Sequence, residues 1–250
     1  MPRKLTKKEI YSKWGISFEN DHILYNGEWI RELLKKGNDK TGKRVYTFSL
    51  PAGTNGTCVC DCKGCYAKTG RYVTPFVMAS LKRNQTIVEN DIDFFYRAIS
   101  AQLETIGAGE IRIHAAGDFN TKNSREYADC WKRLVSENPS FLFWTYTKIA
   151  AYETLFDGTE NGNIVKSYIN GIGYNFGHCD YIIETYNKLV KMGANVYICR
   201  CGIDKNQHCE NCKHCATAKF VLFIEHSTDY VAENDPLFET LKAIIESQAA

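Results

Sequence analysis

The sequence predicts an α/β fold arranged around a parallel β-sheet. Short runs rich in β-branched and aromatic residues alternate along the chain with longer segments that have the apolar period of a helix. The composition, with 44% hydrophobic and 24% charged residues, is that of a globular protein. A length of 250 residues suffices for one large α/β domain. Such alternation favours a parallel sheet with helices packed against it.

The N-terminal segment differs from the rest of the chain in charge. We predict a basic N-terminal extension over residues 1–43 and an α/β domain over residues 44–250. Residues 1–50 carry eleven Lys or Arg against six Asp or Glu, although the whole chain has a net charge of only +2. This local excess is one signature of a nucleic-acid contact, with a solvated basic arm as the alternative. A helix is expected near residues 28–36, ended by a Gly-Asn-Asp sequence.

The elements of the α/β domain are assigned from periodicity and turn signals. The run Phe-Leu-Phe-Trp-Thr-Tyr-Thr is apolar on both faces, as in a buried parallel strand. A Gly- and Asn-rich stretch over residues 150–177 is assigned no element. Strands are expected at residues 44–50, 110–116, 141–147, 195–199 and 220–225. Helices are expected at residues 76–106, 122–136, 180–192 and 236–248.

The chain lacks sequence signals for secretion or membrane insertion. Its first residues contain no apolar segment of the kind found in signal peptides. No apolar run approaches the roughly 20 residues that span a bilayer. We therefore expect a cytoplasmic protein that does not contact a membrane. The eleven cysteines of a protein in a reducing compartment indicate metal or redox chemistry rather than disulfides.

A first cysteine group follows the first predicted strand. Cys58, Cys60, Cys62 and Cys65 occur within eight residues, in a loop that also contains several glycines. Such density is hard to explain by packing, since a buried structural cysteine is usually solitary. Soft thiolates favour zinc or iron–sulfur centres, and zinc sites usually pair two well-spaced cysteine knuckles. The group is therefore predicted to bind a metal centre.

The spacing of Cys58, Cys62 and Cys65, C-x3-C-x2-C, resembles the signature of the radical S-adenosylmethionine (SAM) superfamily. The resemblance implies a [4Fe–4S] cluster on these three cysteines, with a fourth iron chelated by SAM and the chemistry of a deoxyadenosyl radical. It also implies an incomplete parallel (β/α) barrel, here with a cysteine-rich C-terminal insertion. The superfamily's Gly-rich turn after the second strand corresponds to Ala116-Gly117-Asp118-Phe119, which places Gly117 and Asp118 at the SAM amino group.

Three features depart from the superfamily pattern. Gly64 stands where an aromatic residue usually precedes the third cysteine, and Tyr66 follows that cysteine instead. Tyr66 is accordingly included among the expected cofactor-binding residues. The usual Gly-Gly-Glu is Ala-Gly-Asp in this chain. Cys60 is an additional thiol, and a cluster that it closed as fourth ligand would have no iron open to SAM.

A second resemblance covers roughly residues 37–222. The chain is similar to a phage and plasmid family known as gene product 88-like. This resemblance implies mobile-element origin, a setting in which proteins often act on nucleic acids. The sequences that carry it are Leu50-Pro51-Ala52-Gly53, Cys65-Tyr66-Ala67, His114-Ala115-Ala116-Gly117-Asp118-Phe119 and Trp144-Thr145-Tyr146-Thr147-Lys148.

A second cysteine group lies in the segment 199–215. The spacing C-x2-C-x2-C resembles ferredoxin-type loops, in which a fourth ligand lies apart in sequence. A second [4Fe–4S] cluster is the first choice, a structural zinc the next, and one site shared by both groups the third. His208 and His214 are further candidate ligands, whereas Cys130 and Cys179 are isolated. The group consists of Cys199, Cys201, Cys209, Cys212 and Cys215.

Two other polar residues are candidates for ligand contact. His114 alternates with two isoleucines on the second strand, so it could face a ligand inside a barrel or be a hydrogen-bonded core histidine. Lys148 ends the third strand, at the edge where α/β sheets bind ligands. It could bind a carboxylate or phosphate, or be a solvated lysine. Trp144 and Tyr146 could stack on bases or pack in the core.

These patterns favour an iron–sulfur protein, with a radical-SAM-like enzyme of unknown substrate as the leading function. No catalytic residue is assigned. The alternative from another class is a non-enzymatic iron–sulfur module with closed clusters that binds nucleic acid or senses redox state. A third hypothesis is a protein that binds only zinc.

Overall fold

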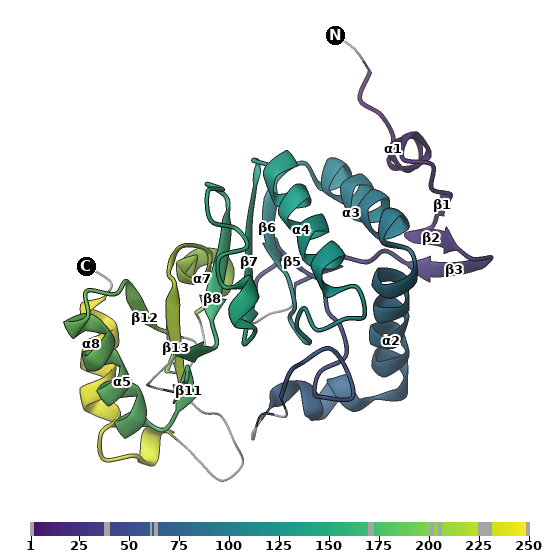
Figure 1. The fold of residues 1–250 in the computed structure, drawn as a ribbon. Helices are drawn as coiled ribbons and strands as arrows, with labels where there is room; N and C mark the ends of the chain where they lie inside the picture. Colours follow the sequence, from purple (N-terminus) through teal and green to yellow (C-terminus); the bar gives the residue numbers. More distant parts are fainter. Residues whose placement is uncertain are drawn as a thin grey trace.

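The computed structural model describes residues 3–37, 41–60, 62, 65–169, 173–200, 203–204, 207–224 and 232–248. Helices and β-strands are both present throughout the chain, and a larger, mostly parallel sheet lies beside a smaller parallel sheet (Figure 1). The predicted α/β class is therefore confirmed. Within the described residues, no helix is both long enough and apolar enough to cross a membrane.

The larger sheet contains five strands in the order β4-β5-β6-β7-β8. The last four are parallel, and β4 pairs with β5 in the antiparallel sense. Beyond β5 the chain stays bonded to the segment after β6, because Leu50 N donates to Ala116 O at 2.9 Å. The carboxyl ends of four strands thus meet at one edge. The bounds are β4 (Lys35–Lys36), β5 (Val45–Thr47), β6 (Gly109–Arg112), β7 (Phe141–Thr147) and β8 (Gly162–Lys166).

Three helices cover one face of this sheet: α2 (Pro75–Asn90), α3 (Ile92–Ile106) and α4 (Ser124–Glu137) (Figure 1). The helix predicted over residues 76–106 is interrupted by Asp91, whose backbone is not helical. Its carboxylate accepts a hydrogen bond from Phe94 N at 2.9 Å and so caps α3. Two shorter helices therefore replace the single one expected.

The opposite face of β7 and β8 is covered by the second cysteine group. Its two short helices are α6 (Cys209–Cys212) and α7 (His214–Thr217). Alternate residues of a strand point to opposite faces. Ile164 accordingly packs in the core beneath α2–α4, whereas Val165 packs against Ala218 and Val221 on the other side. The cysteine-rich segment is therefore part of the packed structure.

The smaller sheet has the order β11-β13-β12 and is parallel. It has its own core with α5 and α8, and Lys166 N joins it to the larger sheet by donating to Lys219 O at 3.2 Å. The described strands form open sheets rather than a closed barrel. The bounds are β11 (Phe176–Gly177), α5 (Cys179–Lys191), β12 (Val196–Ile198), β13 (Phe220–Ile224) and α8 (Phe238–Ser247), and an antiparallel pair, β9 (Tyr168–Ile169) and β10 (Gly173–Tyr174), precedes them.

The prediction of a helix near residues 28–36 is wrong, because this segment forms strands β3 and β4. Asn26 and Gly27 have φ values of 47° and 84° and make a two-residue turn, so that Tyr25 pairs with Glu28. An Asn-Gly turn of this kind directs a hairpin and outweighs the helical pattern. The bounds are α1 (Lys7–Lys13), β1 (Phe18–Glu19), β2 (His22–Tyr25) and β3 (Glu28–Arg31).

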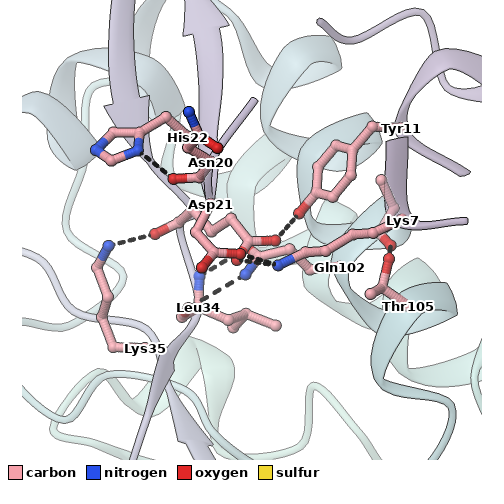
Figure 2. Close-up of polar contacts among 11 residues, drawn as sticks. Lys7, Tyr11, Asn20, Asp21, His22, Leu34, Lys35, Gln102 and Thr105 are labelled. Atoms are coloured by element: carbon pink, nitrogen blue, oxygen red, sulfur yellow. Dashed lines mark hydrogen bonds and ion pairs between the residues drawn. The ribbon is translucent and has the colours of Figure 1, made fainter. Parts of the chain in front are cut away.

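The basic N-terminal segment packs onto the domain and is not a solvated arm. Tyr11 is fully buried in the main core. Lys7 Nζ lies 2.7 Å from Asp21 Oδ1 (Figure 2). It also lies 2.9 Å from Glu32 Oε2. The Gln102 amide on α3 bonds to both the backbone N–H and the backbone carbonyl of residue 34 (Figure 2). Part of the basic excess is thus neutralised within the fold.

Candidate functional site

The first cysteine group begins in a loop that the backbone holds firmly at the carboxyl end of β5. Thr57 donates to Pro51 O through both its N–H, at 2.9 Å, and its hydroxyl, at 3.0 Å. Cys58 N donates to Gly53 O at 3.2 Å. Gly53 has a φ of 85°, a conformation that glycine adopts without steric cost. These bonds set the position of the first thiol of the group.

The turn after β6 lies directly against this loop. Asp118 N donates to Thr57 Oγ1 at 3.1 Å. Gly117 has a φ of 85°, and a Cβ added there would lie 2.6 Å from Thr57 Oγ1 and 2.7 Å from Leu50 Cβ. The groups that approach Gly117 this closely are Leu50 and Thr57 of the chain itself. Its predicted role at the SAM amino group stays a prediction.

The Asp118 carboxylate joins this turn to the end of β7. It is only 4% exposed. Oδ1 accepts from Thr147 Oγ1 and from Phe119 N, both at 2.8 Å, and Oδ2 accepts from Lys148 N at 3.0 Å. Burial raises the pKa of Asp118, and the hydrogen bonds from Lys148 N, Phe119 N and Thr147 oppose that rise. Asp118 therefore stabilises the fold by joining the turn after β6 to the end of β7, in addition to any ligand contact that it makes.

Two thiols of the first group, those of Cys60 and Cys62, lie beside Lys148 and Tyr174. Cys60 Sγ is 3.7 Å from Cys62 Sγ. The Lys148 ammonium hydrogen-bonds to Cys62, and the Tyr174 hydroxyl hydrogen-bonds to Cys60. Burial would lower the pKa of Lys148, but Cys62, Asp118 and Cys60 together raise it, so the side chain keeps its positive charge. Lys148 thus supplies a cation next to the sulfur atoms.

Burial governs the protonation state of the first thiol of the group, that of Cys58. It raises the pKa of Cys58 to about 11, although the backbone hydrogen bond at Gly53 works in the opposite direction. Metal ligation by this sulfur would therefore release a proton. None of the ten described cysteines forms a disulfide.

The donor set suits an iron–sulfur centre in chemistry, because the described first group offers four soft sulfur ligands and a cation at its edge. In the described part of the chain, no three Cys, His, Asp or Glu side chains already converge on one point where a metal ion could bind. Cluster binding would therefore draw the sulfurs together. The residues therefore fit an iron–sulfur cluster by the type of their side chains and by their common location.

The Tyr66 hydroxyl is engaged inside the protein. It donates to Ala115 O and accepts from Arg112 Nη2 at 2.9 Å. Tyr66 as a whole residue is 55% exposed, and its ring meets that of Tyr72 edge to face with the ring centres 5.7 Å apart. The exposed part of Tyr66 could still contact a cofactor, as predicted. That contact stays a prediction.

His114 lies in the core, which was the alternative to a ligand-facing position. β6 ends at Arg112, and His114 adopts a left-handed φ of 57°. This turn breaks the alternation of the strand. Nε2 bonds to Tyr127 Oη at 2.7 Å and Nδ1 to Thr145 Oγ1 at 3.3 Å, so both ring nitrogens are engaged. Burial lowers the pKa of His114 to about 3 and keeps the ring neutral.

Part of the second cysteine group packs against a hydrophobic cluster. Cys199 and Cys215 are part of the small cluster around Val165, and Cys209 and Cys212 lie in α6. Cys201 lies outside the described residues. Burial raises the pKa of Cys215 to about 12, and a hydrogen bond with Tyr146 opposes that rise. The structure thus places four of the five predicted ligands in one segment.

The two histidines beside the second group differ in their environment. His214 stacks on Tyr197 with the ring centres 3.9 Å apart. His208 Nδ1 is buried and has no hydrogen-bond partner in the described structure. Such an atom is costly unless something binds it. This observation fits a metal at the second group, with His208 available as a ligand.

Arg112 and Thr57 are site residues that the sequence patterns did not single out. Arg112 lies between the two cysteine groups, and the only local signal for it is its alternation with Ile111 and Ile113 on a buried strand. Thr57 connects the first loop to the turn at Gly117 through a hydroxyl that is fully buried. Neither residue belongs to a recognisable motif.

Comparison with protein families gives a match to the family described as Gene product 88, over residues 32–169. The match includes the first cysteine group, the Gly117 turn and Lys148, and it ends before the second cysteine group. Comparisons with curated proteins and with solved structures find no match. Because the match covers more than half of its residues, the chain belongs to the Gene product 88 family.

Proposed function

We propose that this chain is an iron–sulfur protein that holds a [4Fe–4S] cluster on Cys58, Cys62 and Cys65 and acts as a radical-SAM-like enzyme. The observation that carries the proposal is the location of the first cysteine group. Its thiols follow the first parallel strand, at the carboxyl edge of the sheet, next to Asp118 and Lys148. Ligands of open α/β sheets bind at this edge.

Within the proposal, the four parallel strands β5–β8 and the helices outside them form an incomplete barrel of radical SAM type. When bound, a cluster with one open iron would supply the electron that cleaves SAM. Lys148 offsets negative charge beside the sulfurs, and Asp118 fixes the ends of β6 and β7 that border the site. SAM binding at Gly117 and Asp118 rests on the resemblance of the turn.

A second candidate function is a closed cluster without radical chemistry, in a cytoplasmic redox-sensing or nucleic-acid-binding protein. Cys60 favours it. Its sulfur lies 3.7 Å from that of Cys62, so it is close enough to the other ligands to act as the fourth. A cluster closed in this way would leave no iron for SAM.

The second cysteine group is proposed to bind a metal as well, a second [4Fe–4S] cluster or, as the alternative, zinc. Within the described residues, two buried nitrogen atoms near it lack hydrogen-bond partners, His208 Nδ1 and Arg112 Nε. A ligand that approaches the group would give both an interaction partner.

Substitution of Cys60 separates the two candidate functions. Cys60→Ala and the matched control Cys130→Ala, which alters a half-buried thiol on α4, would be purified without oxygen and compared for iron content. The enzyme hypothesis predicts full iron content in both variants and a change in the EPR signal of the reduced cluster on addition of SAM. Loss of iron in Cys60→Ala alone, with no response of the wild type to SAM, would establish the closed cluster instead.

A further inference from the structure

Arg112 occupies a position between the two cysteine groups. Its Nη2 donates to the Tyr66 hydroxyl at 2.9 Å, and Tyr66 directly follows Cys65 in the chain. Its guanidinium carbon lies 5.1 Å from the centre of the Tyr146 ring. The Tyr146 hydroxyl in turn hydrogen-bonds to Cys215. A continuous set of contacts therefore runs from the first group through Arg112 to the second.

The strand register explains why Arg112 faces the second group. Ile111 and Ile113 pack in the core beneath α2–α4, so the residue between them points to the opposite face. That face carries α6 and α7. Arg112 is the last residue of β6, which leaves its guanidinium level with the loop of the first cysteine group.

Among the residues that the structure describes, the positive charge of Arg112 has no carboxylate counterpart. Within the described residues, no Asp or Glu oxygen forms an ion pair with it, and its Nε is buried without a hydrogen-bond partner. Its polar neighbours are tyrosine hydroxyls and the thiols of Cys209 and Cys215. Arg112 is of intermediate exposure, and a guanidinium that is even partly removed from water is costly unless a negative charge compensates it. Protonated thiols carry none, whereas thiolates bound to an iron–sulfur core do.

We infer that Arg112 is the counter-charge of a cluster bound by the second cysteine group and connects that cluster to the first group through Tyr66. The inference rests on the proposed function. Arg112 is a positioning residue, because it acts on the sulfur ligands and on Tyr66. A nearby positive charge favours the more negative, reduced form of a cluster, and so raises its reduction potential.

The test is a redox titration of the full-length protein purified without oxygen. Arg112→Gln removes the charge, Arg112→Lys retains it, and Arg133→Gln is the matched control, since Arg133 is exposed on α4 and pairs with Glu137. The signal of the second cluster is assigned as the one that disappears in Cys209→Ala. We expect a lower midpoint potential in Arg112→Gln, most of the wild-type value in Arg112→Lys and no change in Arg133→Gln.

Tyr66→Phe keeps the inference testable if Arg112→Gln does not fold, because it removes only the hydroxyl that anchors the guanidinium. A smaller decrease in the same potential is expected. Equal potentials in the wild type, Arg112→Gln and Tyr66→Phe would overturn the inference and leave the first cluster as proposed. Zinc at the second group would also overturn it. A wild-type protein without iron would overturn the inference together with the proposed function.

Discussion

The two cysteine groups differ in how they are built into the same sheet. The first lies at the carboxyl edge, where Val59 is 48% exposed and the sulfurs have polar neighbours such as Lys148. The second covers one face of β7 and β8, where Val165 and Ala218 are fully buried. The edge group is thus arranged for access to a ligand, and the face group for packing. A metal at the second group would therefore contribute to stability as well as to chemistry.

The largest effect is expected from the residue that anchors the edge group. Asp118→Ala leaves the Thr147 hydroxyl and the backbone N–H groups of Phe119 and Lys148 without their buried acceptor. We expect a loss of about 3–5 kcal/mol in the free energy of unfolding, since each unsatisfied buried donor costs roughly 1–3 kcal/mol and the effects overlap. Urea denaturation measures it. Asp118→Asn, which keeps one acceptor oxygen, should lose less. A loss below about 1 kcal/mol in Asp118→Ala would show that these bonds do not hold the edge.

The corresponding residue of the face group is Asn163. Its side-chain amide donates to Cys215 O at 2.9 Å and to Ala218 O at 2.7 Å. Asn163→Ala should cost about 2–3 kcal/mol, because two buried carbonyl groups lose their donor. Asn163→Ala should also lower the metal content of the second group and leave that of the first unchanged. Asp118→Ala should lower the metal content of the first group and leave that of the second unchanged. Equal metal loss at both groups in either variant would contradict the separation of the two regions.

The buried histidine makes stability depend on pH. His114 has a pKa of about 3 in the folded protein, below that of an ordinary histidine near 6.5, so folding favours the neutral ring. The contribution of the neutral His114 ring to the free energy of unfolding is complete above pH 6.5. It is lost progressively as the pH falls toward 3, by at most about 1.4 kcal/mol per pH unit. Urea titrations at pH 7 and pH 5 should show this slope. His114→Gln should flatten it, and an unchanged slope in that variant would assign the dependence to other groups.

The smallest effect is expected at the rim of the first group. Tyr174 is 37% exposed, and Tyr174→Phe should change the free energy of unfolding by no more than about 0.5 kcal/mol. Tyr127→Phe removes a hydroxyl from a fully buried ring that bonds to His114, and it should cost about 1 kcal/mol. Thermal unfolding of the two variants compares them. A greater loss in Tyr174→Phe would mean that the rim is more ordered than its exposure indicates.

Local sequence patterns predicted the elements that have strong periodicity or dense motifs. The apolar run of β7 and the amphipathic α4 and α5 are present at nearly the expected bounds. The C-x3-C-x2-C spacing located the first group at a strand end, because a loop with four thiols and several glycines suits no other element. Gly117 was expected beside the SAM amino group, which stays a prediction; the close neighbours that the structure gives it are Leu50 and Thr57.

Other features depend on contacts distant in sequence and could not be read locally. β8 is short and lies in a Gly- and Asn-rich stretch, and its pairing with β7 decides its structure. His114 leaves the alternation of its strand through a left-handed φ that only the packing around Tyr127 fixes. Arg112 shows no pattern of its own, because its neighbours Tyr146 and Cys215 come from other parts of the chain.

The central claim is that thiolates at the carboxyl edge of the sheet hold an iron–sulfur core. Quantitation of iron, sulfide and zinc in the anaerobically purified protein tests it most directly, with a variant in which Cys58, Cys62 and Cys65 are all replaced by Ala. We predict iron and acid-labile sulfide in equal amounts in the wild type and loss of one cluster from the triple variant. Zinc without iron in the wild type, or an unchanged iron content in the triple variant, would contradict the account.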